Sequence, residues 1–182
     1  MYRIPKEMLG PHSVSEAASS QQAEVHRAVG LLIAVWANVE SNMIHLVGRL
    51  LGTSDKNAFI TYYSFGAMRA REAYLSALIA NNLTGPARES AQKVLLRFKK
   101  LSATRNELVH SEYVLNPDMT YAGTAYTRLD QKTFEVSVKE RTFDKARLNE
   151  MKHTVSELTA TGHALLSLCD QIDREHEQSR MV

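Results

Sequence analysis

The fold is decided by residues 25–50, which read VHRAVGLLIAVWANVESNMIHLVGRL. Apolar side chains recur in this stretch at alternating steps of four and three residues, the spacing of one face of a long helix packed lengthwise against other helices. The members of this face are Val25, Val29, Leu32, Trp36, Val39, Met43, Leu46 and Leu50. Gly52 follows the last member and predicts the end of the helix.

A second helix of the same kind is predicted near the C-terminus. Its apolar face includes the small residues Gly162 and Cys169, which let a neighbouring helix approach closely. The members of the face are Leu148, Met151, Val155, Leu158, Gly162, Leu165, Cys169 and Ile172. Residues 56–82 favour a less regular helical region with a break near residues 64–66, and Thr84-Gly85-Pro86 starts a further helix that runs to about residue 110.

Residues 119–142 change from a helical period to the period of a strand. Phe134, Val136 and Val138 alternate with polar residues, and a polar turn at 130–132 separates them from a segment rich in strand-forming residues. We therefore expect an all-α protein, an antiparallel four-helix bundle with a β-hairpin at about 119–142 inserted before the last helix. Residues 1–20 favour a partly ordered N-terminal arm, and residues 21–182 a single domain, since a hydrophobic content of 44% suits one well-buried core.

Composition narrows the classes of protein to consider. Cys169 is the only cysteine, so no intramolecular disulfide forms and a cytoplasmic location is expected. The longest apolar run, Leu31 to Ala37, is far shorter than the roughly 20 residues that span a bilayer, so no membrane partner is expected. Glu150 and His153 have the spacing of metal ligands, but no second such pair exists and no nucleotide-binding motif is present. No metal and no cofactor is expected.

The candidate chemistry is concentrated in residues 105–110, which read RNELVH at the end of a predicted helix. Arg105 stands where the apolar pattern of this helix calls for an apolar side chain. A guanidinium there must bind an anion, line a cleft or face another subunit, because burying an unpaired charge is prohibitive. Asn106 and His110 are four residues apart and share the neighbouring face with Ser102 and Tyr113. Arg105, Asn106 and His110 together have the chemistry to hold a phosphate.

This motif resembles that of HEPN domains, small all-α proteins found among metal-independent ribonucleases, toxin components and nucleic-acid-associated modules. The likeness consists of Arg105, Asn106 and His110 in an Arg-polar-x-x-x-His pattern, and of an earlier helix that reads WANVE at residues 36–40. It covers roughly residues 24–175. In one toxin subgroup a tyrosine lies two residues after the histidine, and here Tyr113 lies three residues after His110, so the chain departs from that subgroup.

The resemblance implies an endoribonuclease of a defence or toxin–antitoxin type, with RNA as its substrate. The likeness to toxin components also suggests an inhibitory protein partner. Such an enzyme needs no metal, because the ribose 2′-hydroxyl of RNA is the nucleophile. His110 would act as general acid or base, Arg105 would hold the scissile phosphate, and Asn106 would orient His110 or the phosphate. One imidazole does not easily serve as both acid and base, which favours a homodimer with two facing motifs.

Further residues are expected to support this site. Arg97, Lys99 and Lys100 belong to a basic stretch that leads into the motif and are the expected RNA-binding residues, with a solvated helix face as the alternative. Glu40 lies in an apolar stripe, so we expect its carboxylate to contact Arg105 or His110; the alternative is an edge residue whose tip reaches water. Tyr113 would stack a base or bind a phosphate, or else pack against the protein.

The competing interpretation is a non-catalytic helical protein- or RNA-binding module in which the motif is structural. In that case Arg105 pairs with a buried acid, Asn106 bonds a backbone carbonyl, and His110 caps the helix end, where the helix dipole favours a cation. RNA binding without cleavage is a third alternative, which the sequence leaves open.

Overall fold

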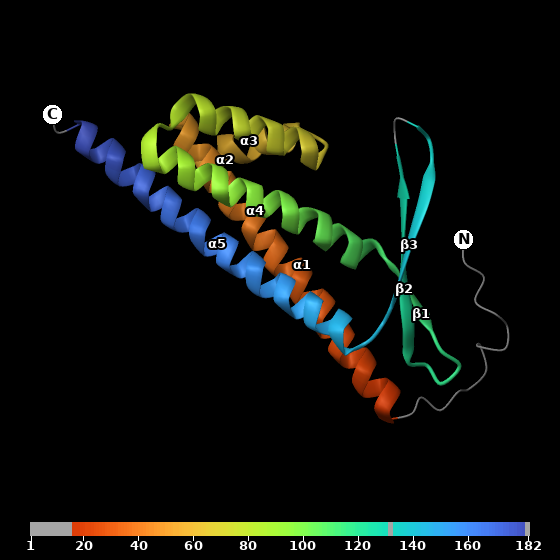
Figure 1. Ribbon diagram of the computed structural model, residues 1–182. Coiled ribbons are helices and arrows are strands. Elements are labelled where there is room, and N and C mark those ends of the chain that lie inside the picture. The colour runs from red at the N-terminus through yellow and green to blue at the C-terminus, as the bar shows by residue number, and fades with distance from the viewer. Residues whose placement is uncertain (1–15, 131–132, 181–182) are drawn as a thin grey trace. The chain divides into compact units, whose positions relative to one another are not determined.

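The computed structural model describes residues 16–130 and 133–180 (Figure 1). These residues form five helices and one sheet of three strands. In chain order the elements are α1 (Glu16–Leu51), α2 (Asp55–Ser64), α3 (Met68–Asn82), α4 (Gly85–His110), β1 (Glu112–Leu115), β2 (Tyr121–Leu129), β3 (Val136–Thr142) and α5 (Lys145–Arg180). The predominantly helical class is confirmed. Residues 16–20 of the expected arm begin α1, and residues 1–15 lie outside the described residues.

The chain divides into two compact units. The first consists of Met1–Leu32 and Arg105–His153, and the second of Ile33–Thr104 and Thr154–Val182. Each of the long helices α1, α4 and α5 therefore contributes residues to both units. The single domain expected for residues 21–182 stays a prediction.

The second unit has a core made by the apolar faces that the sequence predicts. Trp36 of α1 is 4% exposed and stacks on Phe98 of α4, with ring centroids 4.7 Å apart and ring planes inclined by 21°. A stacked aromatic pair stabilises a core by about 0.5–1.5 kcal/mol beyond the burial of its area. Other buried members of the predicted faces in this unit are Val39, Met43, Leu46, Leu50, Leu158, Leu165, Cys169 and Ile172.

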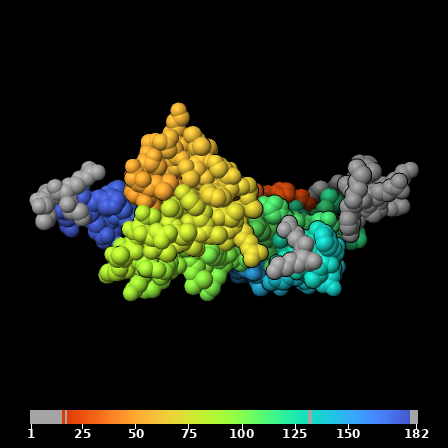
Figure 2. Space-filling view, turned by 90° about the horizontal axis from the view of Figure 1, so that it is seen from above, coloured from red at the N-terminus to blue at the C-terminus, as the bar shows by residue number. Residues whose placement is uncertain are grey.

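The less regular helical region is two helices, α2 and α3, and the break falls where the sequence predicts it. The Ser54 hydroxyl accepts a hydrogen bond from the backbone N–H of Asn57 and so caps the start of α2. α2 ends at Ser64, where the following residue has extended backbone. Figure 2 shows α3 and the first part of α4 side by side, in yellow and light green, and Lys99 Nζ donates across them to Ser76 Oγ at 3.4 Å.

The first unit contains the sheet, which is antiparallel with the order β1-β2-β3. β2 and β3 form the predicted hairpin, with Leu129 opposite Val136 and Thr127 opposite Val138. β1 is an additional strand that the sequence did not predict. It has only four residues and a register irregularity between Val114 and Leu115, so it is too short to show an alternating pattern. The sheet follows α4 directly, and its position there fixes what surrounds residues 105–110.

Gly123 of β2 has a close backbone neighbour on β3. A Cβ atom added at Gly123 would lie 2.9 Å from the carbonyl oxygen of Arg141, which belongs to the sheet ladder and is not free to move away. We expect Gly123→Ala to lower the free energy of unfolding by about 1–3 kcal/mol through this overlap. Gly30→Ala is the matched control, because nothing lies within 4 Å of its added Cβ.

Urea denaturation followed by circular dichroism measures both glycine variants. Gly30 lies inside α1, where alanine is favoured over glycine by up to about 1 kcal/mol, so Gly30→Ala is expected to stabilise the protein. Equal stability of Gly123→Ala and the wild type would contradict the close approach of β2 and β3 at this position.

One helix in the described part of the chain, over Ala18–Leu51, is long and apolar enough to cross a membrane by length and composition alone. The core helix of a soluble protein meets the same criterion. In α1 most of the apolar face of residues 25–50 is buried within the protein, with Leu32 and Met43 both 0% exposed. Core packing accounts for this face, whereas Leu31 and Ile33 lie off it and are 51% and 45% exposed. The absence of a membrane partner stays a prediction.

Candidate functional site

The motif residues lie at the C-terminal end of α4, in the first unit. Arg105 and Asn106 are half-buried, and His110 is exposed as the last residue of the helix. Arg105 Nη1 donates a hydrogen bond to Asn106 Oδ1 at 2.9 Å. Since Asn106 and His110 are four residues apart on a continuous helix, the imidazole lies about one turn further along the same face. The structure thus brings a held guanidinium and an exposed imidazole to one end of one helix.

Asn106 has a partner that the sequence did not predict. The expectation was that its amide would orient His110 or a bound phosphate, whereas its side-chain oxygen accepts from Arg105. This hydrogen bond restricts the rotamers of a long side chain that would otherwise lose much conformational entropy on binding an anion. Asn106 therefore positions Arg105.

Tyr113 is held by the end of α4. Its hydroxyl donates to the backbone carbonyl of Leu108 at 2.9 Å, which satisfies one of the last carbonyl groups of the helix. Its ring lies 5.4 Å from that of Tyr121 and 6.2 Å from that of Phe143, and burial raises the pKa of its hydroxyl. These contacts match the packing alternative for Tyr113.

A charged cluster surrounds Glu107, the residue between Asn106 and the buried Leu108. Its carboxylate accepts from Lys139 of β3, from Arg141 Nε at 2.9 Å and from Arg147 Nη2 at 3.2 Å. Arg147, near the start of α5, is only 4% exposed and also binds Glu150 at 2.6 Å. The cluster ties the motif end of α4 to the sheet and to α5. The sequence did not predict this cluster, although Glu107 is the only acidic residue of the motif and Lys139 and Arg141 alternate along the hairpin.

The pKa of the Glu107 carboxyl reflects this cluster. Burial by itself raises the pKa, but the hydrogen bond from Lys139 and the charges of Arg141 and Arg147 outweigh burial and hold the pKa below its usual value of 4.5. A lowered pKa in the folded state stabilises the protein at pH values above 4.5, and this contribution is lost as the pH falls through the folded-state pKa.

We therefore expect the free energy of unfolding to fall as the pH is lowered from about 6 towards 3, and to fall less steeply in Glu107→Gln, which has no carboxyl to protonate. Urea midpoints across this pH range measure both proteins. Parallel pH profiles for the two proteins would contradict the assigned role of the Glu107 charge.

Apart from Tyr113, the residues expected to support the site lie in the second unit. Glu40 binds Arg71, with 3.5 Å between Oε1 and Nη1, and its predicted contact with Arg105 or His110 stays a prediction. Ser102 is buried. Of the three expected RNA-binding residues, Arg97 binds Glu157 at 2.8 Å and Lys99 donates to Ser76, whereas Lys100 is exposed. Two of the three cations therefore already have partners within the protein.

His26 is a second imidazole in the first unit that the sequence did not single out. It is exposed on α1, and its Nε2 lies 3.0 Å from the hydroxyl of Tyr121. The ring of Tyr121 in turn lies 5.4 Å from that of Phe143. His26 and Tyr121 join the start of α1 to β2, and no pattern in the sequence links residues so far apart in the chain.

The described residues contain no group of three or more His, Cys, Asp or Glu side chains placed to hold a metal ion. Within the Glu150-x-x-His153 spacing, the carboxylate of Glu150 binds Arg147 and Arg141. Glu150 thus belongs to the cluster around Glu107.

Comparison of the chain with protein-family models, with curated proteins and with solved structures gives no match. The resemblance to HEPN domains therefore rests on sequence motifs alone, and it stays a prediction.

Proposed function

We propose that this protein is a metal-independent endoribonuclease of the HEPN type. The observation that supports the proposal best is the hydrogen bond that holds Arg105 against Asn106, with the exposed imidazole of His110 about one turn further along the same helix face. A fixed cation beside an imidazole, a side chain that can both accept and donate a proton, is what phosphodiester transfer requires. The proposal includes the antiparallel four-helix bundle and the cytoplasmic location that the sequence favours.

The chemistry uses the substrate's own nucleophile. Attack of the ribose O2′ on phosphorus forms the O2′–P bond and breaks the P–O5′ bond, which leaves a 2′,3′-cyclic phosphate and a 5′-hydroxyl. Arg105 binds the nonbridging phosphate oxygens and offsets the charge that grows on them. His110 takes the proton from O2′ or delivers a proton to O5′, and His110 of a second copy performs the other transfer.

A second candidate function is a non-catalytic module that binds protein or RNA. It is favoured by the contacts of Glu107 and Tyr113, both of which are bound within the protein and fasten the motif end of α4 to its surroundings. In this case the same residues hold the sheet in place and no bond in RNA is broken.

The two functions separate in a cleavage assay with matched nucleic acids. Purified protein is incubated in excess chelator with an RNA mixture and with DNA of the same base composition. We expect the RNA to be cut and the DNA to stay intact, because DNA has no 2′-hydroxyl to act as nucleophile. Cleavage of both substrates, or cleavage of RNA only after a divalent metal is added, would contradict the proposed chemistry.

A further inference from the structure

In the part of the chain that the structure describes, β3 is an edge strand with no strand paired to its outer side. The sheet order places β3 at one edge, and every residue from Val136 to Thr142 is exposed. Its ladder with β2 is regular over seven residue pairs, and it contains no proline. Edge strands of this kind present a row of backbone N–H and C=O groups that pair readily with another strand. The opposite edge, β1, is four residues long and irregular, and is much less suited to pairing.

Both cations of this edge strand are engaged by Glu107. Lys139 and Arg141 both bind Glu107, so they point to the face of the sheet that meets the end of α4. Because side chains alternate along a strand, Val136 and Val138 point to the other face. They are 65% and 56% exposed there, and Leu129, opposite Val136, is 53% exposed. An edge strand with exposed valines, bound cations and Glu140 as its one further charge has little of the usual protection against pairing.

The sequence of β3 is complementary to itself. In an antiparallel pair centred on Val138, Val138 faces Val138, Val136 faces Glu140, and Ser137 faces Lys139. The next pair outward sets Glu135 against Arg141, so no like charges face each other. A shift of the centre to Lys139 would oppose two ammonium groups, and a shift towards the turn would shorten the overlap. In a register shifted by one residue, side chains from opposite faces of the two strands would be paired, and valines would lie opposite the cations.

We propose that β3 pairs antiparallel with β3 of a second copy of this chain, with Val138 on the two-fold axis. The axis then runs perpendicular to the sheet, and the two three-stranded sheets become one continuous sheet. The pairing satisfies the open backbone groups of both strands and brings the two Val138 side chains into contact. The pairing involves only the strand and does not depend on RNA cleavage.

One consequence rests on the proposed function. A two-fold axis perpendicular to the sheet leaves the equivalent faces of the two sheets on the same side. The Glu107 contacts of both copies therefore lie on one side of the joined sheet. The Cα atoms of Lys139 and its copy would be about 8 Å apart, from the spacing of paired strands and the rise along them. The ends of both α4 helices, and with them both motifs, therefore approach the axis from the same side. The two motifs that the reaction needs would be supplied by this pairing.

Cysteine cross-linking of the full chain tests the proposal. In Val138→Cys the two introduced thiols lie opposite each other, with Cβ atoms about 4.5–5.5 Å apart, a separation close to that of a disulfide. The native Cys169 is buried, and burial raises the pKa of its thiol to about 11, so it does not compete. Thr127→Cys is the matched control. Thr127 is the partner of Val138 on β2, and the two copies of Thr127 would be separated by three strand spacings, about 14 Å.

We expect mild oxidation to convert Val138→Cys to a disulfide-linked dimer of twice 20.4 kDa, while Thr127→Cys and the wild type stay uncross-linked. We also expect the wild type to sediment as a dimer and Val138→Lys, which opposes two ammonium groups at the axis, to dissociate at least tenfold more readily. Equal cross-linking of the two cysteine variants, or a monomeric wild type, would overturn the proposal. A dimer of folded Val138→Lys as tight as the wild type would overturn it as well. Because mass and cross-linking are measured without RNA, failure here is distinct from failure of the proposed function.

Discussion

Replacing His110 with alanine is expected to slow metal-free RNA cleavage by about 10²–10⁴-fold, the usual contribution of a positioned general acid or base. His110 is the proposed general acid or base of the motif, and alanine leaves the attacking O2′ or the leaving O5′ without a partner for proton transfer. The side chain is exposed at the last position of α4, so its removal leaves no cavity in the core. The rate is measured under single-turnover conditions in excess chelator, with urea denaturation as a check on folding.

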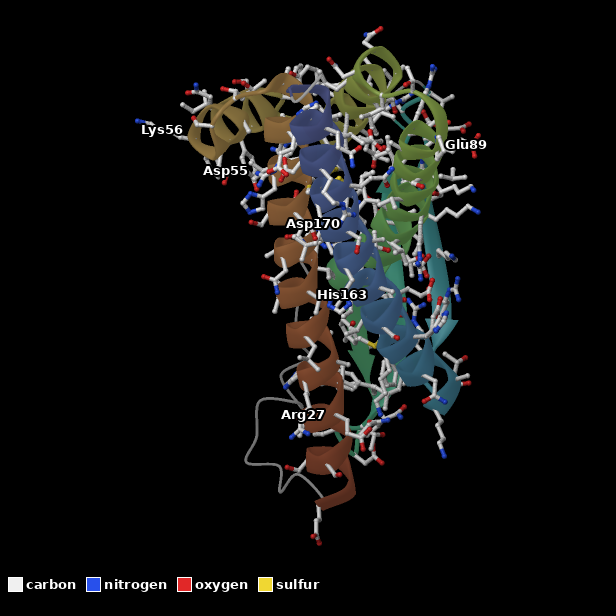
Figure 3. All side chains as sticks on the ribbon, turned by 90° about the vertical axis from the view of Figure 1, so that its left-hand side faces the viewer. Arg27, Asp55, Lys56, Glu89, His163 and Asp170 are labelled. Carbon is white, nitrogen blue, oxygen red and sulfur yellow. The ribbon has the colours of Figure 1, made fainter. Side chains whose placement is uncertain are left out.

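His163→Ala is the matched control for this variant. His163 is an exposed histidine on α5, labelled in Figure 3, and belongs to the second unit. We expect His163→Ala to cleave RNA at the wild-type rate. If His110→Ala also retained the wild-type rate, the cleavage would not be carried out by the motif, and the structural interpretation of residues 105–110 would take its place.

Glu107→Ala is expected to have the largest effect on stability. Losing one partner of a buried ion pair costs about 3–5 kcal/mol when the other charge is left without compensation. Arg147 is 4% exposed and would keep Glu150 as a partner, so we expect a smaller loss of about 2–3 kcal/mol. The unfolding free energy in urea at neutral pH measures this loss.

Glu112→Ala provides the comparison, because Glu112 is an exposed glutamate five residues further along the chain. Its removal is expected to change the unfolding free energy by no more than about 0.5 kcal/mol. Equal losses for the two variants would mean that the cluster around Glu107 contributes no more than a surface charge.

The helices follow from the sequence because their apolar periodicity is long and regular. Leu32, Met43 and Leu158 lie on the predicted faces, and all three are fully buried. The β2–β3 hairpin also follows, since its alternation extends over enough residues to separate from the helical period. β1 does not, because its four residues carry too little pattern and it is held in place by pairing with β2. Local pattern predicts an element only when the element is long enough to repeat it.

The position of the motif residues on a helix follows from the sequence, but most of their contacts do not. Arg105, Asn106 and His110 lie at the end of a helix as expected, whereas the hydrogen bond between Arg105 and Asn106 was not predicted, because adjacency in sequence does not fix side-chain rotamers. The partners of Glu107 come from β3 and α5, more than thirty residues away, and no spacing rule connects them. Glu40 was expected near the motif, and its ion pair with Arg71 depends on the packing of α3, which the sequence left irregular.

The chemical nature of the new ends tests the proposed function most directly. RNA cut by the wild-type protein in excess chelator is analysed by mass spectrometry of the fragments. Attack by the 2′-hydroxyl, with Arg105 on the phosphate and His110 moving the proton, predicts fragments that end in a 2′,3′-cyclic phosphate and begin with a 5′-hydroxyl. Fragments that carry a 3′-hydroxyl and a 5′-phosphate would show that water was the nucleophile and would contradict the mechanism, and RNA that stays intact would contradict the proposed function itself.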